Sequence, residues 1–128
     1  MNKSSIKQMN TTALAYMGDA VYEVYVRKHV MQQGAVYVDK LHKMGVNYVK
    51  AASQAKAIKG IFDSLTLEEQ SLVKRAKNRK VTTKAKNADI FDYKWATAFE
   101  ALIGYLYLCD EHERMEEVIH RGMEIIDE

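Results

Sequence analysis

Residues 95–106 read WATAFEALIGYL and form the centre of the most apolar segment of the chain. Between Ala88 and Cys109 large apolar side chains recur every three or four residues, a spacing that predicts one helix running through the middle of a core. A single carboxylate, Glu100, interrupts this apolar centre. Because an unpaired buried charge costs several kcal/mol, we expect a compensating group beside it.

The remaining segments are also predicted to be helical. In chain order the expected helices cover residues 11–33, 39–60, a short segment after 66, 88–109 and 111–126. Thr11 or Thr12 would cap the first helix, and Gly45 would bend or divide the second. Thr66 and Glu69 have the spacing of a capping box. The sequence shows no strand alternation, repeat or linker, so we predict an all-α helical bundle with one domain over residues 1–128.

The composition excludes several classes of protein. A chain of 128 residues has room for one core. Lys and Arg number 19 and Asp and Glu 17, a net charge of +2 that is too balanced for a general polyanion binder. With 48% hydrophobic and 28% charged residues the chain is neither disordered nor a membrane protein, and it begins without an apolar signal segment. We therefore expect a cytoplasmic protein with no membrane partner.

The positive charge is concentrated in one segment. The candidate nucleic-acid-binding residues are Lys74, Arg75, Lys77, Asn78, Arg79, Lys80, Lys84 and Lys86. No acid lies among them, and residues 75–87 hold almost no apolar side chains, which predicts an exposed loop. Such a loop is either simply solvated or binds a phosphate backbone through counterion release. Hydroxyl and amide side chains among the basic ones raise the second interpretation to equal weight with the first.

A second isolated acid, Asp19, lies within LAYMGDAV at residues 14–21. Gly18 adjoins Asp19, and Gly104 follows Glu100 by one turn, so two helices could approach closely and bring the two carboxylates together. A pair of acids without Cys or His ligands suits Mg²⁺, or Mn²⁺, which can activate water for phosphodiester cleavage. Each acid taken alone is more often a surface residue or an ion-pair partner, and Glu23 is interpreted as exposed.

The residues that carry these features resemble a known family. MGDAV at 17–21 and FEALIG at 99–104 are similar to the two signatures of the ribonuclease III catalytic domain, most closely in the Mini-III ribonucleases. The resemblance implies an all-helical, dimeric, Mg²⁺-dependent endonuclease for double-stranded RNA that leaves 5′-phosphate ends and matures the precursor of 23S ribosomal RNA. It also implies that Asp19 and Glu100 are the catalytic, metal-binding acids and that the basic segment binds RNA.

The chain departs from the wider family at two acid positions, which are Ala15 and Thr97 here. A four-acid metal shell is thereby reduced to two acids, which leaves the number of metal ions open. One alternative is therefore a catalytically silent RNA-binding or ribosome-assembly protein on the same fold. Another is a helical nucleotide pyrophosphatase, but that class needs clustered acids, and its chemistry leaves the basic segment unexplained.

Overall fold

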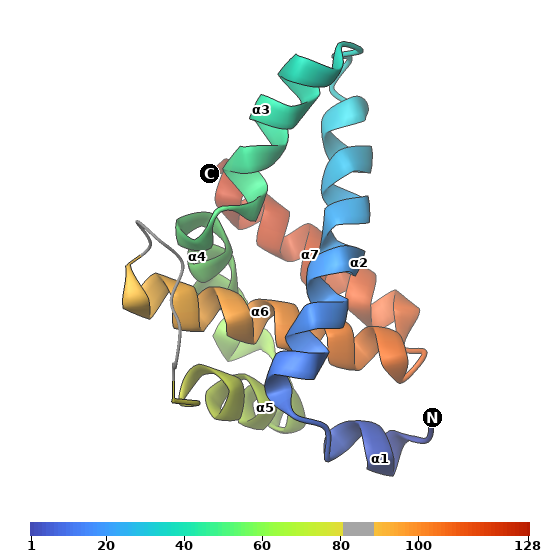
Figure 1. The fold of residues 1–128 in the computed structure, drawn as a ribbon, viewed down its shortest axis with the longest axis vertical. Helices are drawn as coiled ribbons and strands as arrows, with labels where there is room; N and C mark the ends of the chain where they lie inside the picture. Colours follow the sequence, from blue (N-terminus) through green and yellow to red (C-terminus); the bar gives the residue numbers. More distant parts are fainter. Residues whose placement is uncertain (81–88) are drawn as a thin grey trace.

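A computed structural model describes residues 1–80 and 89–128 (Figure 1). The helices of this part of the chain are, in order, α1 (Lys3–Lys7), α2 (Thr11–Met31), α3 (Val38–Val49), α4 (Ala51–Ile61), the 3₁₀ helix η1 (Phe62–Ser64), α5 (Leu67–Lys77), α6 (Ile90–Leu108) and α7 (His112–Asp127). The described residues contain no strand, so the predicted all-α class is confirmed.

Helix α6 lies at the centre of the bundle, as its apolar sequence predicted. It packs against α2, α4, α5 and α7, and Phe99, Leu102 and Ile103 in its middle are completely buried. Figure 1 shows α2 crossing in front of α6 and continuing upward with α3 away from the rest of the bundle. The residues of α6 that follow Phe99 therefore lie at the crossing of the two longest helices.

Two glycines make this crossing close. A Cβ atom on Gly18 would overlap the carbonyl oxygen of Glu100, and one on Gly104 would overlap the carbonyl oxygen of Leu14. Each glycine thus contacts the backbone of the opposite helix directly, which no other residue type permits. The prediction that Gly18 and Gly104 allow α2 and α6 to approach is confirmed.

Three predicted boundaries are wrong. The segment 39–60 divides at Lys50, which is extended (φ −65°, ψ 150°), and Gly45 lies inside α3. Asn10 caps α2 by accepting from the amide of Thr12, in place of a threonine cap. The helix after Thr66 continues to Lys77, so the basic segment begins within a helix and not as a loop at Arg75.

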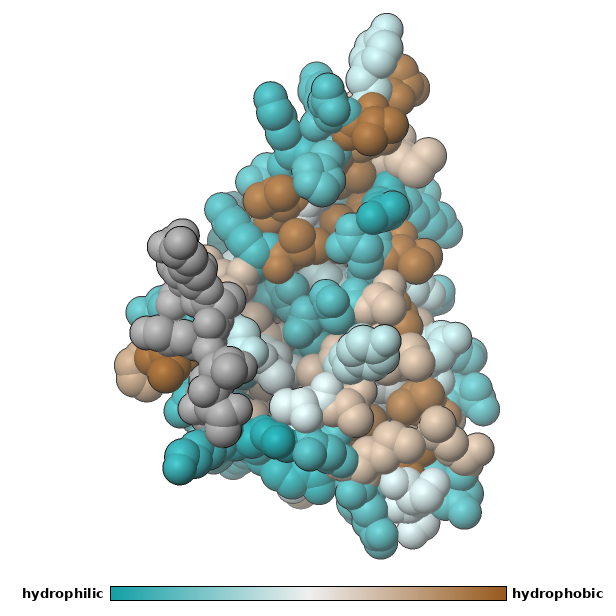
Figure 2. Space-filling model, viewed as in Figure 1, coloured by the Kyte–Doolittle hydropathy of each residue, from teal (hydrophilic) through white to brown (hydrophobic). Residues whose placement is uncertain are grey.

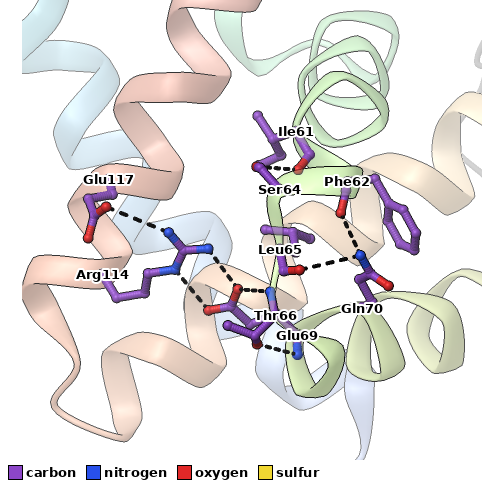
Figure 3. Close-up of polar contacts among 9 residues, drawn as sticks. All are labelled: Ile61, Phe62, Ser64, Leu65, Thr66, Glu69, Gln70, Arg114 and Glu117. Atoms are coloured by element: carbon purple, nitrogen blue, oxygen red, sulfur yellow. Dashed lines mark hydrogen bonds and ion pairs between the residues drawn. The ribbon is translucent and has the colours of Figure 1, made fainter.

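The start of α5 is fixed to α7. Thr66 and Glu69 form the predicted capping box, since each side chain bonds the backbone amide of the other. Arg114 donates two hydrogen bonds to the Glu69 carboxylate, at 3.0 and 2.8 Å (Figure 3). Burial acts to raise the pKa of Glu69, but the hydrogen bonds from Arg114 and Thr66 outweigh it and lower that pKa. The basic end of α5 is therefore carried by a helix with an anchored beginning.

The surface of α2 and α3 is partly apolar. Figure 2 shows apolar side chains among polar ones where these two helices project. On α2, Tyr16 is 81% exposed, Val24 64% and Met31 60%. No helix within residues 1–80 and 89–128 has the length and apolar character needed to cross a membrane. The cytoplasmic location stays a prediction.

Candidate active site

The crossing of α2 and α6 brings Asp19 and Glu100 together. Burial raises the pKa of Glu100 to about 8, and the adjacent Asp19 adds charge repulsion and a hydrogen bond that favours the protonated carboxyl. Two acids from distant parts of the sequence thus lie side by side, and Glu100 keeps its proton at neutral pH. A cation can stabilise this arrangement, because a bound cation takes the place of the proton and compensates the negative charge of the two carboxylates.

The two acids differ in their exposure. Asp19 is exposed, whereas Glu100 is only partly exposed. Asp19 is therefore not a buried charge, although its neighbours in the sequence are apolar. Its apolar neighbours Tyr16 and Ala20 are exposed as well. The site is thus a carboxylate pair at the edge of the core, with one member open to solvent.

A third polar side chain, Gln54 of α4, was not predicted to belong to the site. Gln54 is only 3% exposed. Its Nε2 donates to the carbonyl oxygen of Val49 at 2.8 Å and to Oε2 of Glu100 at 3.4 Å. Gln54 therefore brings a hydrogen-bond donor from α4 to the Glu100 carboxylate. Its Oε1 is buried and has no hydrogen-bond partner among the described residues.

These groups fit a divalent cation with oxygen ligands. Asp19 and Glu100 supply carboxylate oxygens of the type that Mg²⁺ and Mn²⁺ prefer. The orphan Oε1 of Gln54 is a buried acceptor that a metal-bound water could satisfy. No group of three or more His, Cys, Asp or Glu that could hold a metal occurs among residues 1–80 and 89–128. Water and substrate oxygens would therefore complete the coordination.

Residues 15 and 97, where the resemblance leads us to expect acids, supply no ligand here. Ala15 is buried, and the hydroxyl of Thr97 donates to the carbonyl oxygen of Tyr93 at 2.9 Å. Glu23 accepts from Arg27 one turn later, at 3.1 Å, as a surface ion pair. The carboxylate chemistry of this site is thus limited to Asp19 and Glu100.

The basic residues near the end of α5 face two directions. Lys74, Arg75 and Lys77 lie in the last turns of the helix, and Asn78 caps its end. On one side Arg75 donates to the carbonyl oxygen of Lys7 at 3.2 Å, and Arg79 donates to Oδ1 of Asn10.

Both arginines therefore contact the segment that leads into α2. Lys74 and Lys77 lie on the other side, toward η1 and α6. Lys80 is exposed at the end of the described segment. Lys84 and Lys86, which are also predicted to bind RNA, lie outside the described residues.

Comparison with known proteins places this geometry in a family. A family model described as "Ribonuclease III domain" matches residues 12–111. A Clostridium tetani protein named Mini-ribonuclease 3 is 45% identical over 127 residues, 98% of this chain and 84% of that protein. A protein of the same name from Thermoanaerobacter is 40% identical over all 128 residues, 90% of its own length.

A solved structure of a similar protein has the same fold. The chain superimposes on a Fusobacterium nucleatum protein with a TM-score of 0.80 and 32% identity, over 91% of this chain and 93% of that one. The family model spans both Asp19 and Glu100 as well as α5. The chain therefore belongs to the ribonuclease III family, among the Mini-ribonuclease 3 proteins, and is an endoribonuclease.

Proposed function

We propose that Asp19 and Glu100 hold Mg²⁺ for the cleavage of double-stranded RNA, and that the natural substrate is the precursor of 23S ribosomal RNA. The observation that carries the metal assignment is the meeting of these two carboxylates where Gly18 and Gly104 bring α2 and α6 into contact. The substrate assignment is what the resemblance of the motifs to the Mini-III group implies, and the relatives named Mini-ribonuclease 3 support membership of that group.

The chain's own residues have distinct parts in this reaction. When bound, the ion would supply an activated water for in-line attack on a phosphodiester and would stabilise the leaving oxygen. Glu100, whose pKa is raised to about 8, must release its proton before it can act as a ligand. Gln54 holds the Glu100 carboxylate in place. The basic residues of α5 bind the phosphate backbone, so the duplex is recognised by its shape, including its departures from a regular helix.

The protein acts as a homodimer in this proposal. The exposed face of α2 carries Tyr16, Val24 and Met31, an apolar stripe that water disfavours. Asp19 lies beside this stripe on the same helix. A second copy packed on α2 would cover the apolar side chains and place two carboxylate pairs along one duplex, so that each strand is cut once.

One experiment tests the metal, the substrate and the geometry of the cut. A duplex from the 23S precursor and an unrelated duplex of equal length are incubated with and without Mg²⁺, and the cut ends are mapped. We expect cleavage of the precursor duplex with Mg²⁺ only, 5′-phosphate ends and a short 3′ overhang. Cutting in EDTA would contradict the metal assignment, equal cutting of both duplexes would contradict the substrate, and unpaired nicks would contradict the dimer.

A further inference from the structure

Two aromatic side chains form an edge-to-face pair beside the basic end of α5. Phe62 of η1 and Trp95 of α6 have ring centroids 6.3 Å apart and an interplanar angle of 85°. Both rings are partly exposed and pack against the core. Their contact joins η1 to α6, and side chains from α4 and α5 reach the same two rings.

Three lysine ammonium groups lie over these rings. The Nζ atom of Lys77 is 4.8 Å from the Trp95 centroid, and that of Lys59 is 5.7 Å from the same ring. The Nζ atom of Lys74 is 5.8 Å from the Phe62 centroid. We call these five residues the lysine–aromatic cluster. Lys59 comes from α4, outside the basic segment that the sequence singled out.

The positive charge of the cluster is uncompensated within the described chain. Every salt bridge found among residues 1–80 and 89–128 uses other cations, so none of the three lysines has a carboxylate within 4.0 Å there. Like charges held near one another favour the arrival of an anion. The aromatic contacts restrict the lysine side chains before binding, which lowers the entropy that a phosphate contact would cost.

The cluster lies along the same pair of helices as the carboxylate site. Trp95 precedes Glu100 by five residues on α6, and Lys59 follows Gln54 by five residues on α4. At a rise of about 1.5 Å per residue, this places the cluster about 8 Å along the helix axes from the Gln54–Glu100 contact. The cluster and the carboxylate pair therefore lie within about one and a half turns of each other along the same two helices.

We propose that the lysine–aromatic cluster binds the phosphate backbone of double-stranded RNA next to the carboxylate pair. This inference rests on the proposed function and adds Lys59, Phe62 and Trp95 to it. Lysine ammonium groups lie over the Trp95 ring, so the ring supports cations and does not stack on a base. Arg75 and Arg79, by contrast, already donate to Lys7 and Asn10 and connect the basic segment to the start of α2.

The protein carries its own probe for this proposal, because Trp95 is its single tryptophan. The complete chain is titrated with a blunt RNA duplex in EDTA, which prevents metal-dependent cutting. Trp95 emission and the anisotropy of labelled RNA are recorded together. We expect both signals to change with the same midpoint. Anisotropy that saturates while Trp95 emission stays constant would overturn the proposal.

Substitution separates the cluster from the basic segment. Lys59→Gln should weaken binding several-fold and reduce the slope of log affinity against log salt by about 1, as the loss of one phosphate contact does. Lys43→Gln, at an exposed lysine of α3, is the matched control and should bind as the parent does. Trp95→Leu should weaken binding with all three lysines present, and Trp95→Phe should restore part of it.

The outcomes distinguish this proposal from the proposed function. If Lys59→Gln binds and cuts duplex RNA as the parent does, the cluster is not part of the interface, although the nuclease assignment stands. If Lys59-dependent binding is found without Mg²⁺-dependent cutting, the cluster is supported and the metal assignment fails. If no duplex is bound at all, both are overturned.

Discussion

Replacing Gly18 by alanine should separate the two carboxylates of the site. The added Cβ would overlap the Glu100 carbonyl oxygen and also lie 2.9 Å from the Gly104 nitrogen, which are backbone atoms that cannot rotate away. Restoring an ordinary contact of about 3.4 Å requires α2 and α6 to move apart locally by about 1.7 Å. A misplacement of about 1 Å can cost 100-fold in rate, and overpacking of this kind costs about 1–3 kcal/mol of folding free energy.

Gly45→Ala is the matched control. This glycine is also helical, but its added Cβ would meet only a Val26 methyl group at 3.7 Å, an ordinary contact. It should leave cleavage unchanged and stabilise the fold by about 0.5–1 kcal/mol through helix propensity. Denaturant unfolding and single-turnover cleavage of a defined duplex measure both effects. If Gly18→Ala cuts at the parent rate and unfolds like Gly45→Ala, the close crossing does not position the site.

Three further predictions concern ion pairing, pH and assembly. Arg114→Leu leaves the buried Glu69 carboxylate without its ion-pair partner. The free energy of unfolding should therefore fall by about 3 kcal/mol, which thermal unfolding would show as a loss of about 10 °C in Tm. An unchanged Tm would contradict this. The pKa of Glu100 is about 8 in the folded protein and an ordinary 4.5 in the unfolded chain. As the pH rises, the unfolded chain therefore releases this proton at a lower pH than the folded protein does. The metal-free fold should lose stability between these two pKa values. In EDTA Glu100→Gln should therefore melt above the parent at pH 8 and together with it near pH 4, and an equal Tm at both would refute the raised pKa. Val24→Glu should halve the mass measured by light scattering, while Val36→Glu, at an even more exposed valine outside the helices, leaves it unchanged. Equal masses for the two variants would contradict a dimer through α2.

The sequence was sufficient to predict the centre of the fold and the acid pair. The apolar period of α6 identifies a central helix because burial on every side needs apolar residues on every side. Gly18 and Gly104 predict the crossing because each lies within one turn of an isolated acid. The capping box at Thr66 is local chemistry and needs no tertiary information.

What the sequence could not predict depends on packing between distant segments. The division at Lys50 carries no proline or glycine, so nothing local marks it, whereas Gly45 is tolerated inside α3. Gln54 is an ordinary helix residue by composition, and only its place among the buried residues Ser53, Ala55 and Ala57 could have singled it out. The sequence did not predict that Asp19 is exposed. Apolar neighbours on a helix indicate a buried face, but they do not show whether another helix of the same chain covers that face.

In the proposed reaction, cleavage depends on an ion that Asp19 and Glu100 hold together. The most direct test is the single-turnover rate of cutting of one defined duplex across a range of Mg²⁺ concentrations, for the parent, Asp19→Asn, Glu100→Gln and the exposed control Asp39→Asn. We predict that both site variants lose at least about 100-fold at every Mg²⁺ concentration while Asp39→Asn follows the parent. Site variants that cut at the parent rate would contradict the assignment of these two carboxylates.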